Sequence, residues 1–362
     1  MTDLVRDAVD ARSPDVDLGV DRDLARVLMT DMVLARRLSE RLWNLQRQGK
    51  VTTVTPIAGH EAAAVGVVRA LDLDVDWIVP YYRELVGFAA VGDDYLTSVV
   101  KYWRGHPDGG RAPESARVLP PQISLASQIP QAAGLAWGIK LRGEPGVVCT
   151  FIGDGATSEG DFYEGLNLAG VQRAPLVVVV VNNGWAISTP TSRQTAAATF
   201  AAKAEAVGAR GMRIDGTDVV AVHDAAAEAR AHAVAHGPVL LELVTYRLGA
   251  HTNSDDPTRY VPADELATWR ARDPIEQFRA VLAGAGQWSD SDHQRVLDEV
   301  EGRVDRLIDA ALDDPVDARR AFDHVFDADT PRLAAQRADL ASRHGDPNGL
   351  ADGARPETGG VS

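Results

Sequence analysis

Two short polar segments carry the residue types that hold a divalent cation and a diphosphate. Gly153-Asp154-Gly155 follows one apolar run, and Asn183 follows the next, with a segment of helical length between them. Mg²⁺ in proteins takes six oxygen ligands and is usually shared with phosphate groups. A carboxylate and an amide oxygen supply two ligands, and a backbone carbonyl near Trp185 supplies a third. The sequence therefore predicts a magnesium–diphosphate site.

The scaffold for these groups is a strand–helix–strand unit. Residues 147–152 and 176–181 are apolar runs of strand length, and 158–172 has the length and pattern of a helix. Parallel strands joined by a helix end at the same edge of a sheet, about 4.8 Å apart. Ligands of such sheets bind at that edge, so Asp154 and Asn183 are expected to reach one ion.

Glycines and backbone amides complete the predicted anion site. Gly153 and Gly155 let the chain turn sharply and approach a phosphate closely. The N–H groups of Gly155 and Ala156 precede the helix, so its dipole adds to their attraction for an anion. Each segment alone is more simply explained as a turn, but their occurrence at both strand ends of one unit favours the binding site.

A nicotinamide-dinucleotide site is the rival interpretation, because Gly153-x-Gly155 also follows a strand. However, Ser158 stands where that fingerprint needs a third small residue. The second strand ends in Asn182-Asn183 instead of an acidic residue for a ribose. These differences disfavour the dinucleotide site, and a titration with and without a chelator separates the two.

The rest of the chain continues the alternation of strands and helices. Long amphipathic segments at 21–48 and 59–71 predict helices, and the Gly/Pro-rich stretch 104–122 predicts a long ordered loop. We expect an α/β fold, with a parallel sheet, helices on both faces and a helical C-terminal appendage. The expected organisation is a flexible acidic arm at 1–20, a binding domain with helical extension at 21–330, and a helix end and disordered tail at 331–362. Further predicted elements are strands at 77–79, 213–214 and 239–246 and helices at 129–142 and 219–236.

Composition excludes several classes of partner. The chain has 37 Lys+Arg against 52 Asp+Glu, a net charge of −15, which disfavours nucleic acid and anionic membranes. Its longest aliphatic run, 176–181, is far shorter than the roughly 20 residues of a membrane helix. Cys149 is the single cysteine, and its apolar neighbours predict a buried side chain. With an acidic N-terminus that does not resemble a signal peptide, we expect a cytoplasmic protein.

The Gly-Asp-Gly motif and the double Asn, with Asn183 placed 29 residues after Asp154, resemble a known family signature. The chain is similar over residues 45–326 to the alpha subunit of the decarboxylating first component of 2-oxo acid dehydrogenase complexes, of pyruvate or branched-chain type. The resemblance implies a thiamine-diphosphate-binding fold and the cofactors thiamine diphosphate and Mg²⁺. It also implies residue roles: Asp154, Asn183 and the Trp185 carbonyl on Mg²⁺, Tyr82 and Arg83 on the diphosphate, Gly155 and Ala156 through their backbone, Ile123 and Leu125 beside the coenzyme, with Leu125 supporting its bent conformation, and His251 as the catalytic residue over the thiazolium.

The implied reaction is oxidative decarboxylation of a 2-oxo acid with transfer of the acyl group to a lipoyl group. His251 is expected to titrate near neutrality and to donate to the developing alkoxide. The implied partners are a beta subunit, in an α₂β₂ heterotetramer, and a lipoyl-bearing acyltransferase. Pyruvate is slightly favoured over branched-chain acids such as 3-methyl-2-oxobutanoate, with acetoin dehydrogenase a third reading and a non-catalytic coenzyme-binding scaffold a fourth.

Some positions depart from the family pattern. Val181 stands where relatives often carry Arg or Gln, and Ala250 where relatives carry His or Pro. Thr53 and Val54 replace aromatic residues near the substrate entrance. The segment 251–260 resembles the family's loop that becomes ordered when coenzyme binds.

Overall fold

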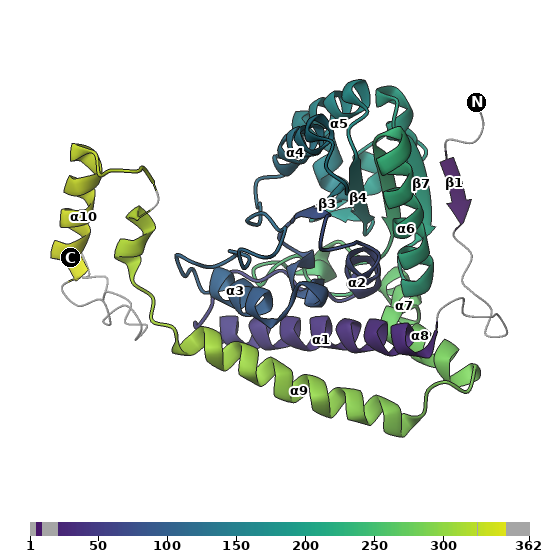
Figure 1. Ribbon diagram of the computed structural model, residues 1–362. Helices are drawn as coiled ribbons and strands as arrows, with labels where there is room; N and C mark the ends of the chain where they lie inside the picture. The colour runs from purple at the N-terminus through teal and green to yellow at the C-terminus, as the bar shows by residue number, and fades with distance from the viewer. Residues whose placement is uncertain (1–4, 9–20, 324, 345–362) are drawn as a thin grey trace.

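A six-stranded sheet, in which all neighbouring strands are parallel, forms the centre of the protein (Figure 1). The computed structural model describes residues 5–8, 21–323 and 325–344. The strand order is β1-β7-β8-β4-β3-β2. This confirms the expected α/β fold with a parallel sheet. The strands are β1 (Val5–Ala8), β2 (Trp77–Val79), β3 (Val148–Gly153), β4 (Leu176–Asn182), β7 (Arg210–Asp215) and β8 (Val239–Val244), with a separate short pair, β5 (Trp185–Ala186) and β6 (Thr189–Pro190).

Helices cover both faces of the sheet, as its side-chain pattern requires. Successive residues of a strand point to opposite faces. In β3, Cys149 and Phe151 pack with α1, α2 and α6, whereas Val148 and Ile152 pack with α4 and α5. Both faces are therefore apolar, which explains why β3 and β4 have continuous apolar sequences. The helices are α1 (Arg22–Arg47), α2 (Glu61–Arg69), α3 (Asp93–Trp103), α4 (Gln128–Arg142), α5 (Gly160–Gln172) and α6 (Val219–His236).

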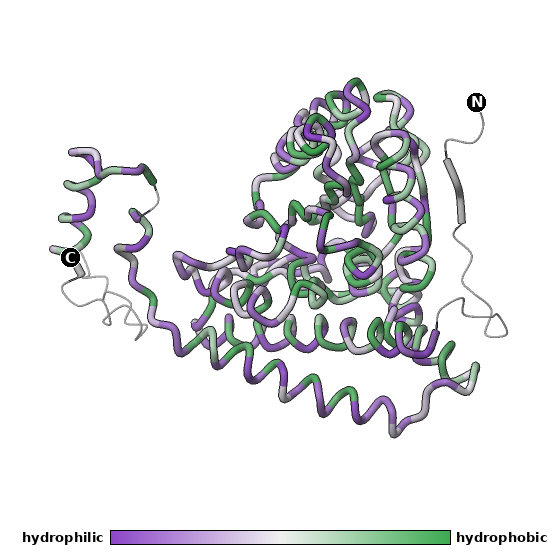
Figure 2. The backbone as a smooth tube through the Cα atoms, in the orientation of Figure 1, coloured by the Kyte–Doolittle hydropathy of each residue, from purple (hydrophilic) through white to green (hydrophobic). Residues whose placement is uncertain are grey.

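The C-terminal part is helical, as expected. α9 runs along α1 (Figure 1), and its Val296, Val300 and Val304 are buried against the core. Figure 2 shows that hydrophilic residues predominate along the rest of α9. No helix within the described ranges is long and apolar enough to cross a membrane. The C-terminal helices are α7 (Ala263–Arg270), α8 (Pro274–Gly284), α9 (Asp290–Asp313) and α10 (Pro331–His344).

The N-terminal segment departs from the sequence prediction. Val5–Ala8 was expected to be part of a flexible acidic arm, but it forms β1, which pairs with β7. The reason is non-local, because the edge of β7 offers unpaired backbone groups to any nearby extended segment. The remaining predicted arm (1–4 and 9–20) and the predicted tail from 345 onward lie outside the described residues, and the domain limits stay predictions.

The start of the helix after β3 also differs from the prediction. Instead of one helix from Ser158, a 3₁₀ turn, η3 (Asp154–Ser158), precedes α5. Glu159 between them has extended backbone angles, φ −77° and ψ 149°, which end the turn and start α5 at Gly160. The amides of Gly155 and Ala156 thus belong to the tight turn, and the dipole of α5 lies one turn further from the predicted anion than expected.

Candidate active site

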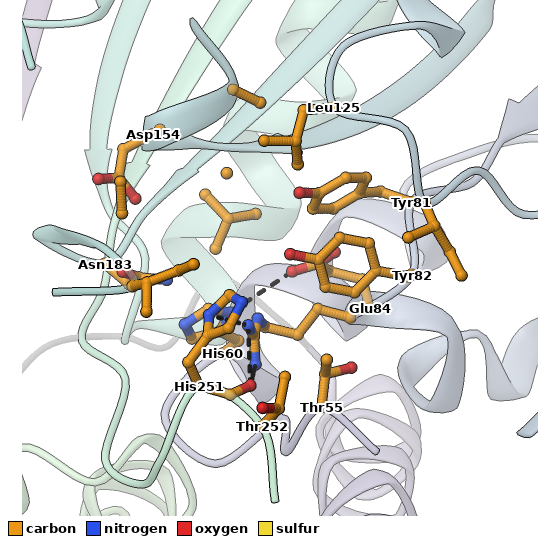
Figure 3. Close-up of a pocket in the computed structure, with 18 of the residues that line it drawn as sticks. Thr55, His60, Tyr81, Tyr82, Glu84, Leu125, Asp154, Asn183, His251 and Thr252 are labelled. Carbon is orange, nitrogen blue, oxygen red and sulfur yellow. Dashed lines mark hydrogen bonds and ion pairs between the residues drawn. The ribbon is translucent and has the colours of Figure 1, made fainter. Parts of the chain in front are cut away.

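A cavity of about 430 Å³ lies at the carboxyl ends of the strands, where ligands of parallel sheets bind. Its size lies within the range of small-molecule sites, about 300–1,000 Å³. Every site residue predicted from the sequence lines this cavity, and Figure 3 shows several of them around it. These residues are Tyr82, Arg83, Ile123, Leu125, Asp154, Gly155, Ala156, Asn183, Trp185 and His251.

Asp154 is the carboxylate of the cavity and is almost completely buried, with 1% of its surface exposed. Its Oδ2 accepts a hydrogen bond of 2.7 Å from Gln194 Nε2, while its Oδ1 has no hydrogen-bond partner among the described residues. Burial raises the pKa of Asp154, and the hydrogen bond from Gln194 opposes this rise. A buried carboxylate oxygen without a donor is what a cation-binding site presents before the cation arrives.

Asn183 and Asn182 have different roles although they are adjacent. Asn182 Nδ2 donates to Glu242 Oε1 at 2.8 Å, so Asn182 ties the end of β4 to β8. Asn183 is 5% exposed and lines the cavity; its Oδ1 accepts from the Trp185 backbone N–H at 3.1 Å and keeps a second lone pair. This arrangement holds the Asn183 oxygen and the Trp185 backbone at the carboxyl ends of the strands, where Asp154 also lies.

Gly155 provides the close approach that the sequence predicted. A Cβ atom at Gly155 would lie 2.5 Å from the Cβ of Ala186, so a larger residue would displace the β5 backbone. At Gly153, by contrast, a Cβ would meet nothing within 4 Å. The glycine requirement of this turn is therefore specific to Gly155, whose backbone faces the cavity.

The donor set fits a magnesium–diphosphate group. No cluster of three or more His, Cys, Asp or Glu side chains that could hold a metal exists among the described residues. A cation at Asp154 and Asn183 would therefore need further oxygens from a ligand, and Mg²⁺ shared with phosphates has this pattern. The oxygens of Asp154 and Asn183 suit the metal ion of such a group. The close backbone approach at Gly155 suits its diphosphate.

Positive charge lies on the opposite wall of the cavity. Arg83 is 4% exposed; its guanidinium donates to Pro56 O at 2.9 Å and to His251 Nδ1 at 3.0 Å. A second guanidinium, that of Arg247, lies 3.3 Å from the same nitrogen. Arg83 forms no ion pair with its chain neighbour Glu84 among the described residues, where Glu84 instead faces His60.

The expectation that His251 titrates near neutrality is wrong. Burial lowers the pKa of His251 to about 3, and the positive charges of Arg83 and Arg247 add to the effect. Because the two guanidiniums donate to Nδ1, this nitrogen carries the lone pair, and we assign the proton of the neutral ring to Nε2. His251 is therefore a neutral hydrogen-bond donor at physiological pH.

The segment that carries His251 is held by hydrogen bonds. The carboxylate of Asp255 accepts from the His251 backbone N–H and from the Tyr260 hydroxyl, each at 2.6 Å. Arg247 donates to the same hydroxyl at 2.8 Å. These contacts hold the segment 251–260, which resembles the family's loop that becomes ordered when coenzyme binds.

Apolar residues surround the entrance of the cavity. Ile123 is 59% exposed, Leu125 43% and Ile187 52%, and all three line the cavity. Exposed large apolar side chains that gather at a site usually mark an interaction surface. We call these three residues the apolar rim.

The residues that depart from the family pattern differ in whether they line the cavity. Val181 and Thr53 line the cavity, whereas Ala250 does not. Val54 is buried in the core, and its N–H donates to Asn253 Oδ1 at 2.7 Å. Thr53 is thus the substitution at the entrance that meets the cavity.

Sequence reasoning missed several cavity or cavity-facing residues. His60, Glu84 and Thr55 line the cavity, and Gln194 and Arg247 hold Asp154 and His251. One signal could have found His60: a histidine after Gly59 at the start of an apolar helix. Gln194 had no such signal, because only the fold of the 184–195 loop brings it to Asp154.

Comparisons with known proteins agree with this geometry. Residues 29–319 match the family described as "Dehydrogenase E1 component". The chain is 40% identical over 315 residues to the "Pyruvate dehydrogenase E1 component subunit alpha" of Staphylococcus aureus (strain Mu50), covering 86% of this chain and 85% of the relative. It is 43% identical over 286 residues to the protein of the same name from Staphylococcus epidermidis, covering 78% and 77%.

Proposed function

Because this chain belongs to the dehydrogenase E1 component family, whose sheet architecture is the thiamine-diphosphate-binding fold, we propose that it is the alpha subunit of a 2-oxo acid decarboxylase that acts in the cytoplasm. Enzymes of this family depend on thiamine diphosphate. The observation that carries the proposal is the buried Asp154, which lines the cavity with Gly155 and Asn183 and whose Oδ1 has no hydrogen-bond partner among the described residues. Asp154, Asn183 and the carbonyl of Trp185 would hold Mg²⁺.

The diphosphate would lie between the two charged walls. Arg83 supplies a permanent cation with forked donors, which suits phosphate oxygens. Tyr82, whose ring lies beneath the Arg83 guanidinium at 5.7 Å, supports that cation, and the Gly155 and Ala156 amides supply neutral donors. When bound, the coenzyme supplies the electron-accepting ring needed for loss of carbon dioxide from a 2-oxo acid.

His251 would act in this reaction as a neutral donor. Its Nδ1 is held by Arg83 and Arg247, so the ring is fixed and Nε2–H is free to donate to an oxygen that gains negative charge. A pre-aligned neutral donor costs no proton uptake at neutral pH. Ile123 and Leu125 would contact the coenzyme at the rim and exclude water.

A second chain would complete the active site. The relatives are named as alpha subunits, and the apolar rim leaves large side chains exposed beside the cavity. We propose an α₂β₂ assembly in which a beta subunit covers this rim, and in which the product acyl group passes to the lipoyl group of an acyltransferase.

The substrate is proposed to be pyruvate, on the names of the relatives. Acceptor-dye reduction tests this, with the chain co-purified with a candidate beta subunit. Pyruvate and 3-methyl-2-oxobutanoate are compared, each with and without thiamine diphosphate and Mg²⁺. Turnover of pyruvate that requires both chains, coenzyme and metal is expected. Faster turnover of the branched acid would assign the branched-chain reaction instead, and no turnover of either would favour acetoin or a scaffold.

A non-catalytic scaffold is the alternative from a different class. It predicts that Asp154→Ala and His251→Ala leave assembly intact and change no reaction. If the chain is a decarboxylase subunit, both variants should lose turnover while each still co-purifies with its partner. The fixed His251 ring, which a scaffold does not need, favours the enzyme.

A further inference from the structure

His60 and Glu84 form a buried polar pair in the wall of the cavity. Their side chains are 1% and 2% exposed, and both line the cavity. His60 Nδ1 lies 3.4 Å from Glu84 Oε1, and Figure 3 shows the two groups pointing toward one another. The other polar atom of each, His60 Nε2 and Glu84 Oε2, has no hydrogen-bond partner among the described residues. A buried polar atom without a partner is costly, by about 1–3 kcal/mol, unless a ligand satisfies it.

The helix does not account for the His60 side chain. His60 is the N-cap residue of α2, yet its side chain makes no capping hydrogen bond. The preceding N–H, from Gly59, donates instead to Glu61 Oε2 at 2.8 Å. The ring therefore projects from a helix start into the cavity wall without serving the helix.

The surroundings of the pair place it at the diphosphate end of the cavity. Glu84 follows Arg83 in the chain, and Asp154 is close enough that a positive charge on His60 lowers the pKa of its carboxyl. His60 is thus close enough to interact electrostatically with Arg83, on the predicted diphosphate side, and with Asp154, on the predicted metal side.

Other charges also face His60 from the elements around it. Glu61, from the same helix, attracts a proton to the ring, but its carboxylate is paired with Arg36 of α1. Burial lowers the pKa of His60, the hydrogen bond to Glu84 raises it, and the charge of Arg83 lowers it. Arg83 in turn contacts the neutral His251, which Arg247 also approaches.

The number of protons on the His60–Glu84 pair decides whether Nε2 accepts or donates a hydrogen bond. With a single proton between Nδ1 and the carboxylate, the pair carries a net charge of −1 and Nε2 presents a lone pair. With a second proton, on Nε2, the pair is neutral overall and presents an N–H donor. An anionic ligand accepts hydrogen bonds, so it requires the second state.

We propose that His60 is a further coenzyme-binding residue, which donates Nε2–H to the diphosphate, and that Glu84 positions it and stabilises its protonated form. This inference rests on the coenzyme site proposed above. As the pH rises, the pair loses its second proton, Nε2 becomes an acceptor facing an anion, and the coenzyme binds more weakly.

The test is the dissociation constant of thiamine diphosphate for the co-purified αβ complex, measured by tryptophan fluorescence quenching in Mg²⁺ across about pH 5 to 9, a range that extends to either side of ordinary histidine titration. Four variants are compared with the wild type: His60→Ala, His60→Gln, Glu84→Gln and, as a control, His106→Gln. His106 is buried but does not line the cavity. Circular dichroism and the thermal midpoint check that each variant is folded.

At low pH, His60→Ala is expected to weaken binding roughly tenfold or more, the loss of one charge-assisted hydrogen bond. The deficit should shrink as the pH rises, because the wild type then loses the same donor. His60→Gln keeps an uncharged donor and should restore part of the affinity without this pH dependence. Glu84→Gln should move the weakening to lower pH, and His106→Gln should follow the wild type.

Two results would overturn the inference while leaving the coenzyme site intact: wild-type affinity in His60→Ala, or a deficit equal at all pH values. Titration of the coenzyme's own phosphate affects all variants alike, so the ratio of each variant to the wild type isolates His60. Failure of the wild type itself to bind the coenzyme would instead refute the proposed function.

Discussion

At the scale of single residues, the site depends on two buried groups with opposite requirements. Asp154 is a buried carboxyl group with one oxygen unpartnered among the described residues, whereas burial and the charges of Arg83 and Arg247 keep the His251 ring neutral. Each side chain is also contacted by a residue distant in sequence, Asp154 by Gln194 and His251 by Arg83. The chemistry of the cavity is therefore fixed by the fold and not by the motif alone.

Asp154→Asn is expected to weaken metal binding, because it removes the only carboxylate ligand of the predicted Mg²⁺ site while keeping the side-chain volume. Mn²⁺ can replace Mg²⁺ and be followed by electron paramagnetic resonance in the presence of thiamine diphosphate. We expect the Mn²⁺ affinity to fall at least tenfold, about 1.4 kcal/mol. Asp161→Asn, in the first turn of α5 and outside the cavity, should leave the spectrum unchanged. Equal affinity in both variants would refute the metal assignment.

His251 is expected to remain neutral from pH 8 down to pH 5, because its pKa is lowered to about 3. Imidazole ¹⁵N and ¹³C chemical shifts of the complex without coenzyme should therefore not titrate for this residue in that interval, and His251→Gln identifies its signals. The unfolded chain binds a proton near pH 6.5 that the folded chain does not, so stability contributed by neutral His251 is lost as pH falls from 6.5 toward 3. A midpoint near 6.5 in the folded protein would contradict the two-guanidinium environment.

At the scale of elements, the approach of α2 to the end of β8 positions one wall of the cavity. Gly59, which precedes His60, has φ +95°, and a Cβ there would lie 2.0 Å from the backbone oxygen of Tyr246. Two features therefore require a glycine at position 59: the left-handed backbone angle and the close contact with the Tyr246 backbone. The contact ties the start of α2 to the strand that leads to His251.

Gly59→Ala is expected to be strongly destabilising, and Gly49→Ala is its matched control. Gly49 also has a left-handed φ, +72°, but a Cβ there meets nothing within 4 Å. Gly49→Ala should cost about 1–2 kcal/mol of the free energy of unfolding, the left-handed penalty. Gly59→Ala should cost about 2 kcal/mol more, from overpacking against the backbone. Urea denaturation measures both, and equal losses would show that the close contact carries no energy.

The predicted elements were most accurate where local signals and burial agree. The helix 219–236 and the strand 77–79 were predicted at their observed bounds, because a capping Asp218 and a short apolar run mark them. The strand predicted at 213–214 extends over Arg210–Asp215, because pairing with β8 adds neighbouring residues that include the polar Arg210 and Asp215. β1 and η3 were missed for the same reason, since both depend on contacts that sequence periodicity does not contain.

The candidate site was predicted in part for a similar reason. Residues that follow strand ends, such as Asp154 and Asn183, can be found from the strand pattern and the motif. His60 and Glu84 could not be paired, because their meeting depends on the packing of α2 against the segment after β2. The neutral state of His251 was mispredicted because burial of the ring, and its contact with the distant Arg83, depend on the fold.

At the scale of the whole molecule, the apolar rim and the opposite edge of the sheet allow a controlled test of assembly. Ile123→Asp places a charge in the rim, which should weaken association with the beta subunit. Leu141→Asp is the control, because Leu141 is 70% exposed at the C-terminal end of α4, at the other edge of the sheet. Mass photometry of the co-purified chains should show dissociation for Ile123→Asp alone. Loss of assembly in Leu141→Asp, with Ile123→Asp unaffected, would place the partner elsewhere.

The most direct test of the central claim is a calorimetric titration of thiamine diphosphate into the αβ complex, first with Mg²⁺ and then after chelation. We expect one binding site per alpha chain that disappears when the metal is removed, because the buried Asp154 oxygen and the diphosphate would share the ion. Binding that survives chelation, or a site that takes a nicotinamide dinucleotide instead, would contradict the assignment of this cavity.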